Sequence, residues 1–141
     1  MTQIDKTLIE RRLNRILEYY DELKPHLELS NKDIKEARPI LRSVERLFSL
    51  IVDEAIDINN HIITTHSYTV PDDYHGTFTI LGSNEVVPSK FATKIAGSVG
   101  LRNKIVHVYE VIDVDEMLDK IKTNISDYEE YMKLITAYIS K

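Results

Sequence analysis

The sequence predicts an all-α protein, an antiparallel four-helix bundle with an additional short helix or loop. Turn-forming residues are scarce, because the 141 residues include only 4 glycines and 4 prolines, about half of the usual combined share of roughly 12%. Apolar residues recur at steps of three to five over long segments, which is the helical period. Strand-like and helix-like segments do not alternate, which argues against an α/β fold. The length fits one domain over residues 1–141.

Composition excludes several classes of protein. The net charge is −5, from 18 Lys and Arg against 23 Asp and Glu, which excludes a general nucleic-acid coat. The absence of cysteine excludes disulfide scaffolds, thiol chemistry and Cys-based zinc sites. No stretch approaches the roughly 18 apolar residues of a membrane span, and the N-terminus lacks the apolar core of a signal peptide. We therefore expect a cytoplasmic protein with no membrane contact.

The first half of the chain predicts two long helices with a short turn between them. The first covers residues 5–24, where apolar residues follow the helical period, and Pro25 is expected to stop it. Ser30 or Asn31 is expected to cap a short helical turn. The second long helix covers residues 39–66 and begins with a proline, which suits a first helical position because the missing N–H has no partner there.

Residues 67–89 are the least helical part of the chain. They contain two prolines and two glycines, and they carry acidic residues without any lysine or arginine. We interpret this segment as an acidic connecting loop. A short helical turn at 74–81 and a strand at 77–81 are the two competing interpretations of its middle.

The last third of the chain predicts two more helices. Ser89 is expected to cap a helix that continues over residues 90–112. The segment 96–100 contains two glycines, which predict a kink or a close backbone approach within it. Asp113, followed three residues later by a glutamate, is expected to cap the final helix, residues 113–139.

One face of the helix around residue 102 has an unusual composition. The apolar residues of this segment share the opposite face, because they fall within about 60° of one another on a helical wheel: Leu101, Ile105, Val108 and Ile112. Arg102 and Tyr109 lie about 20° apart, and Asn103 and His107 about 40° apart. Val106, which is apolar, lies among these four. A solvated helix face does not usually have this composition.

Two explanations of this polar face remain open on spacing alone. In the first, the face makes polar contacts with a neighbouring helix or subunit, and His107 is only hydrogen-bonded. In the second, His107 moves protons while Arg102 holds a phosphate. Histidine titrates near neutral pH, and the arginine fork fits phosphate oxygens.

A resemblance favours the second explanation. The spacing Arg102-x4-His107-x-Tyr109 matches the Arg-x4-His-x-Tyr motif of HEPN-domain ribonucleases. With Asn103 directly after the arginine, the chain resembles the HepT-type toxins of HepT/MntA toxin–antitoxin systems, over roughly residues 5–138. Two segments of the second long helix also fit the family's pattern: Val44-Glu-Arg-Leu-Phe and Ala55-Ile-Asp-Ile-Asn-Asn-His.

The resemblance implies a metal-independent endoribonuclease that needs no cofactor. Such proteins are all-helical homodimers in which Arg and His from both subunits line a composite cleft. By this resemblance, His107 activates the ribose 2′-OH or protonates the leaving 5′-oxygen, and Arg102 stabilises the charge that builds on the phosphorane. Asn103 orients His107 or a phosphate oxygen. The expected products carry a 2′,3′-cyclic phosphate and a 5′-hydroxyl.

Tyr109 has a regulatory role by the same resemblance. In HepT/MntA systems, a cognate nucleotidyltransferase antitoxin adds AMP to the tyrosine of the motif. AMP on Tyr109 would block the cleft and compete for Arg102, which makes the chain the toxin of a type VII-like system with an MntA-like partner. The alternative is that Tyr109 only packs in the dimer interface.

Other polar residues give weaker signals. His61 and His66 are five residues apart and so do not share a helix face, and His75 lies in the acidic segment; we predict no metal site. Asp53 and Asp57 share a helix face and could supply an acidic partner to the motif, but an exposed pair is the commoner situation, and they are not included in the predicted site.

Two further functions stay open beside the ribonuclease toxin. One is a non-catalytic HEPN module that binds a partner nucleotidyltransferase. The other is a structural helical adaptor. RNA cleavage in excess chelator separates the first function from these two.

Overall fold

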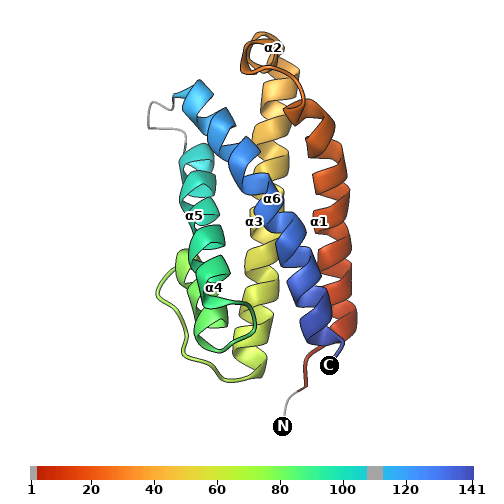
Figure 1. Ribbon diagram of the computed structural model, residues 1–141, viewed down its shortest axis with the longest axis vertical. Coiled ribbons are helices and arrows are strands. Elements are labelled where there is room, and N and C mark those ends of the chain that lie inside the picture. Colours follow the sequence, from red (N-terminus) through yellow and green to blue (C-terminus); the bar gives the residue numbers. More distant parts are fainter. Residues whose placement is uncertain (1–2, 108–112) are drawn as a thin grey trace.

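The computed structural model describes residues 3–107 and 113–141. Within these ranges the chain forms six helices and no strand, which confirms the predicted all-α fold (Figure 1). The bounds of the helices are α1 Lys6–Leu27, α2 Asn31–Glu36, α3 Arg38–Thr65, α4 Tyr74–Ser83, α5 Ser89–Val106 and α6 Val114–Ile139. Tyr109, Val108 and Ile112 lie outside the described residues, and so does the predicted end of the helix over 90–112.

The four long helices α1, α3, α5 and α6 form the bundle. In Figure 1, α3 lies between α1 and α5, α6 crosses the bundle obliquely, and consecutive long helices run in opposite directions. The predicted antiparallel bundle is therefore confirmed, with two short helices in place of one. The short helix α2 packs against α3 and α6, and α4 packs against α3 and α5. None of the described helices combines the length and apolarity that crossing a membrane would need.

Three helix starts follow the local sequence as predicted. The Ser30 hydroxyl accepts a hydrogen bond of 3.1 Å from the Asp33 N–H at the start of α2. The Asp113 carboxylate accepts one of 3.1 Å from the Glu116 N–H at the start of α6. Pro39 lies in the first turn of α3. These caps satisfy backbone N–H groups that have no partner within the helix.

Two predicted helix limits are wrong. Pro25 lies inside α1, which continues to Leu27, instead of stopping the helix at Lys24. Because the helix ends two residues later, the proline interrupts only the last turn. At the start of α5, Ser89 is the first helical residue and makes no side-chain cap; Pro88 occupies the cap position.

The middle of the segment 67–89 is a helix of 10 residues, α4, so the strand alternative is wrong. The Asp73 carboxylate caps it by accepting a hydrogen bond of 2.8 Å from the Gly76 N–H. Phe78 and Leu81, three residues apart, are both buried in the core. The cap and the helical spacing together outweigh the strand propensity of the threonines and isoleucine in this segment.

The close backbone approach predicted for the glycines of 96–100 is not found there; a close approach occurs instead at Gly82 of α4. A Cβ built on Gly97 or Gly100 would have no neighbour within 4 Å, and α5 continues through both residues. A Cβ on Gly82 would instead lie 2.6 Å from the Cβ of Ala92. Gly82 therefore allows α4 to pack closely against α5.

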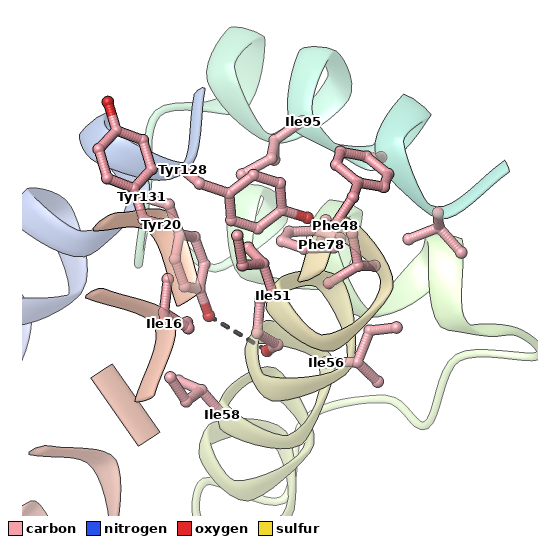
Figure 2. Packing of buried hydrophobic residues seen from close by; sticks show 14 of the residues in the cluster. Ile16, Tyr20, Phe48, Ile51, Ile56, Ile58, Phe78, Ile95, Tyr128 and Tyr131 are labelled. Carbon is pink, nitrogen blue, oxygen red and sulfur yellow. Dashed lines mark hydrogen bonds between the residues drawn. The ribbon is translucent and has the colours of Figure 1, made fainter. Parts of the chain in front are cut away.

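A cluster of aromatic rings lies at the centre of the core. Figure 2 shows Phe78, Tyr128 and Tyr131 gathered with the buried isoleucines of α3 and α5. The Tyr131 hydroxyl lies 2.6 Å from Asn59 Oδ1 and 3.2 Å from the Ala55 carbonyl oxygen. The buried phenol and amide are thus hydrogen-bonded, as buried polar groups must be to avoid a desolvation cost.

Candidate functional site

The guanidinium of Arg102 joins α5 to the middle of α3. Arg102 lies in the last turns of α5, and its Nε donates a hydrogen bond of 2.9 Å to Oδ1 of Asp53. The Arg102 side chain is only 18% exposed, whereas that of Asp53 is 41% exposed. The carboxylate of Asp53 therefore holds Arg102 in one orientation. The ion pair remains partly open to solvent, mainly at Asp53.

Asn103 contacts Arg102 and His107 of the motif. Its side-chain oxygen accepts a hydrogen bond of 3.1 Å from Nη1 of Arg102. Its backbone carbonyl accepts one of 2.9 Å from the N–H of His107. The amide side chain therefore orients Arg102, whereas the link to His107 is made by the backbone.

His107 ends the helix. Its φ of −93° and ψ of 87° lie outside the helical region, so α5 ends at Val106 instead of continuing through His107 as predicted; residues 108–112 of the predicted helix lie outside the described ranges. Residues 105, 106 and 108 are all β-branched, which weakens helix formation here. The predicted wheel relation of Arg102 to Tyr109 reaches a residue outside the described ranges.

The part of the apolar stripe that lies in the described residues is in the core. Leu101 and Ile105 are buried, as predicted. On the other side of α5, Val106 is 43% exposed, and His107 beside it is also exposed. The end of α5 therefore carries an exposed apolar residue, Val106, and an exposed imidazole, His107, a few residues after the partly buried guanidinium of Arg102.

Of the two aspartates weighed from the sequence, only Asp53 reaches the motif. Asp57 lies 3.3 Å from Nη1 of Arg12 on α1, which also pairs with Glu54 at 3.0 Å. One helical turn thus separates a carboxylate that faces α5 from one that faces α1. The helical period places both on the exposed face, but it does not say which neighbouring helix each one meets.

Two of the histidines outside the motif have hydrogen-bond contacts of their own. His61 Nε2 accepts a hydrogen bond of 3.1 Å from the Asp5 N–H, and His66 Nε2 lies 2.8 Å from the Tyr138 hydroxyl. Within residues 3–107 and 113–141, no group of three or more His, Asp or Glu side chains is arranged to hold a metal ion. His75 lies on the exposed surface of α4.

The site combines an oriented cation with a group that can transfer protons. The two hydrogen bonds of Arg102 use two of the five N–H groups of a guanidinium, so it can still donate to a phosphate. Neutral imidazole has one donor and one acceptor nitrogen, so a histidine side chain such as that of His107 is chemically suited to pass a proton. This pair can perform acid–base chemistry on an anionic substrate.

Comparison with known protein families gives a match over most of the chain. Residues 16–135 match the family described as ribonuclease HepT-like. A protein named tRNA nuclease HepT, from Aphanizomenon flos-aquae, is 34% identical over 139 residues, which cover 99% of this chain and 95% of that protein. A protein named mRNA nuclease HepT, from Shewanella oneidensis, is 28% identical over 85 residues, 60% of this chain and 64% of that protein.

Solved structures share the fold. One is described as a tri-AMPylated HEPN toxin of Shewanella oneidensis in complex with an MNT antitoxin. It superposes with a TM-score of 0.84 at 22% sequence identity and covers 92% of this chain and 97% of that chain. At this identity, the likeness shows a common fold.

Proposed function

The chain belongs to the ribonuclease HepT-like family, and we propose that it is an RNA-cleaving toxin whose catalytic residues are Arg102 and His107. One observation carries the proposal most strongly. The arginine of the family motif is fixed by Asp53 and Asn103 at the point where α5 ends at the motif histidine. The names of the two relatives, a tRNA nuclease and an mRNA nuclease, support RNA as the substrate class.

The proposed reaction is a transesterification within the RNA. The ribose 2′-oxygen attacks the adjacent phosphorus, the bond from phosphorus to the 5′-oxygen breaks, and the 2′-OH proton leaves to a base. His107 serves as that base or as the acid that protonates the 5′-oxygen. Arg102 donates to the phosphate oxygens, where negative charge increases in the transition state. The products carry a 2′,3′-cyclic phosphate and a 5′-hydroxyl, without a metal or cofactor.

The proposed active unit is a homodimer. Val106 supports this, because a half-exposed β-branched apolar residue beside the motif is better covered than solvated. A two-fold contact at the end of α5 would bring Arg102 and His107 of both copies to one cleft. In such a cleft one His107 can act as base and the other as acid.

The proposed regulator is a nucleotidyltransferase antitoxin of the MntA type that adds AMP to Tyr109. The related toxin from Shewanella oneidensis is described as tri-AMPylated and in complex with an MNT antitoxin, and this supports the proposal. Adenylylation would place an anionic group next to the motif. Its phosphate could occupy Arg102 in place of RNA.

RNA cleavage in the presence of EDTA tests this function directly. The purified protein is incubated with total tRNA and with mRNA, and the new ends are analysed for cyclic phosphate. Arg102→Ala should lower the rate roughly 10²–10³-fold, as removal of an oxyanion-hole donor does, and Arg102→Lys should not restore it because lysine lacks the planar fork. A folded wild-type protein that binds the transferase but cleaves no RNA would instead favour a non-catalytic binding module.

A further inference from the structure

We propose that a groove between α1 and α3 is a second RNA-binding subsite, which holds the strand that flanks the scissile phosphate. The inference rests on the proposed ribonuclease function and extends it to a surface outside the motif. The groove encloses about 430 Å³. Its lining includes the following residues, which we call the α1–α3 groove: Tyr19, His26, Arg42, Arg46, Leu47 and Leu50.

The groove is aligned with the candidate active site. Arg46 and Arg42 precede Asp53 by 7 and 11 residues on α3, which places them about 10 Å and 16 Å along the helix axis from it, each within about 20° of its direction. Asp53 holds Arg102. A strand whose scissile phosphate lies at Arg102 can therefore continue along the exposed face of α3 past Arg46 and then Arg42.

The two arginines can accept phosphates. Arg46 is exposed, and within the described ranges it forms no ion pair. Arg42 is 64% exposed and pairs with Glu45 on its own helix at 3.0 Å. Exposed pairs of this kind contribute little to stability, so a phosphate can replace the carboxylate. Guanidinium groups suit phosphate oxygens because their N–H groups form a planar fork.

The opposite wall of the groove can accept a base. Tyr19 and His26 are seven residues apart and so lie on one side of α1, where both are partly exposed. Leu47 and Leu50 supply an apolar floor from α3. Glu22 is the one acidic residue among those that line the groove, against two arginines. Aromatic rings beside a row of cations are the usual means of binding single-stranded nucleic acid.

RNA binding at increasing salt concentration tests the phosphate contacts. A labelled single-stranded RNA of mixed sequence is titrated with the His107→Ala protein, so that the RNA stays intact. Each of Arg46→Ala and Arg42→Ala should lower the slope of log K against log salt by about 0.7, the value for one lost contact to a single strand. Lys90→Ala is the matched control, because Lys90 is also an exposed cation but lies at the start of α5; the slope of log K against log salt for this variant should equal that of the parent.

Substitution of Tyr19 tests the base contact. Tyr19→Ala should weaken RNA binding at least about fivefold without changing the salt slope, because a stacked base carries no charge. Tyr19→Phe keeps the ring and should bind like the parent. Thermal melting of each variant separates a lost contact from a lost fold.

Three outcomes would overturn the subsite. The first is binding of the arginine variants that matches Lys90→Ala. The second is equal binding by Tyr19→Ala and Tyr19→Phe. The third is a change of oligomeric state in Arg46→Ala by sedimentation, which would make this face a contact between copies. The proposed function has a separate test: if wild type cleaves RNA and these variants bind normally, only the subsite is wrong, and if wild type neither cleaves nor binds, the function is wrong as well.

Discussion

Arg102 and Asp53 form an ion pair of 2.9 Å that links the last turns of α5 to the middle of α3. The carboxylate contacts Nε, which leaves the outer edge of the guanidinium for a substrate. Asp53 lies on α3, which contributes no residue to the motif. It nevertheless sets the orientation of the motif arginine. This arrangement makes Asp53 a positioning residue for the proposed reaction.

Asp53→Ala is expected to lower the rate of RNA cleavage roughly 10- to 100-fold, because misplacement of a catalytic group by about 1 Å can have an effect of this size. Asp53→Asn keeps a hydrogen-bond acceptor at the same place and should retain more activity. Initial cleavage rates under single-turnover conditions give the comparison.

Asp57→Ala is the matched control for Asp53. It lies one turn further along α3 and pairs with Arg12, so it removes the same charge without freeing Arg102. Equal losses in the two variants would show that the charge of α3, and not the orientation of Arg102, affects cleavage.

His107→Ala is expected to reduce cleavage roughly 10²–10⁴-fold, the usual contribution of a general acid or base. His107 is exposed, and the variant keeps the backbone N–H that closes the last turn of α5, so it should melt within a few degrees of wild type. Single-turnover cleavage and thermal melting are measured on the same preparation. Cleavage at the wild-type rate by the folded variant would exclude His107 from the reaction.

The sequence predicts those features that depend on neighbours within a few residues. Ser30 and Asp113 cap helices as expected, because a cap is a contact of three residues along the chain. The long helices follow from their apolar period. Pro25 and Ser89 show the limit of such local signals. The helix α1 continues past Pro25 to Leu27, and α5 begins at Ser89 itself, one position earlier than expected.

Contacts between helices are less predictable. Asp53 and Asp57 have the same residue type on the same face, yet one pairs with α5 and the other with α1. The difference depends on the angle at which two helices pack, which the apolar period does not specify. The end of α5 at Val106 is not predicted either: the pattern of apolar residues continues to 112, but the β-branched residues here weaken the helix and the backbone at His107 is not helical.

Val106→Asp is expected to convert a dimer to a monomer. Across a two-fold contact, the substitution places two carboxylates close together, and a buried unpaired charge costs several kcal/mol. Sedimentation velocity at micromolar concentration reports the oligomeric state. Val70→Asp is a suitable control, since Val70 is 81% exposed and lies in the connection between α3 and α4. A wild-type protein that sediments as a monomer would contradict the dimer.

Stability is expected to fall as the pH rises above about 10, the ordinary pKa of tyrosine. Burial raises the pKa of Tyr128 and of Tyr131 above that value. The folded protein keeps both phenols protonated where the unfolded chain releases their protons, so the stabilisation present below this pH is lost above it. The free energy of unfolding in urea is measured at about pH 8 and about pH 11, and the difference gives the slope of stability against pH.

Tyr128→Phe should make this dependence on pH less steep. The variant leaves no buried group without a partner, because the Ser98 hydroxyl also donates a hydrogen bond of 2.6 Å to the Ile95 carbonyl. Its stability near neutral pH should drop by about 1 kcal/mol for the lost hydrogen bond. Identical slopes in the variant and wild type would show that Tyr128 does not contribute to alkaline unfolding.

Tyr109→Phe is expected to resist silencing by the cognate nucleotidyltransferase. The substitution keeps the ring and removes the oxygen to which AMP is transferred from ATP with release of pyrophosphate. Wild type treated with the transferase and ATP should gain AMP mass and lose RNA cleavage, whereas the variant should keep its unmodified mass and its own untreated activity. Tyr74→Phe is the control, because Tyr74 is a tyrosine that is 52% exposed and lies on α4; it should be modified and silenced like wild type. Equal AMP incorporation into wild type and Tyr109→Phe would place the modification on another residue and leave Tyr109 a packing residue.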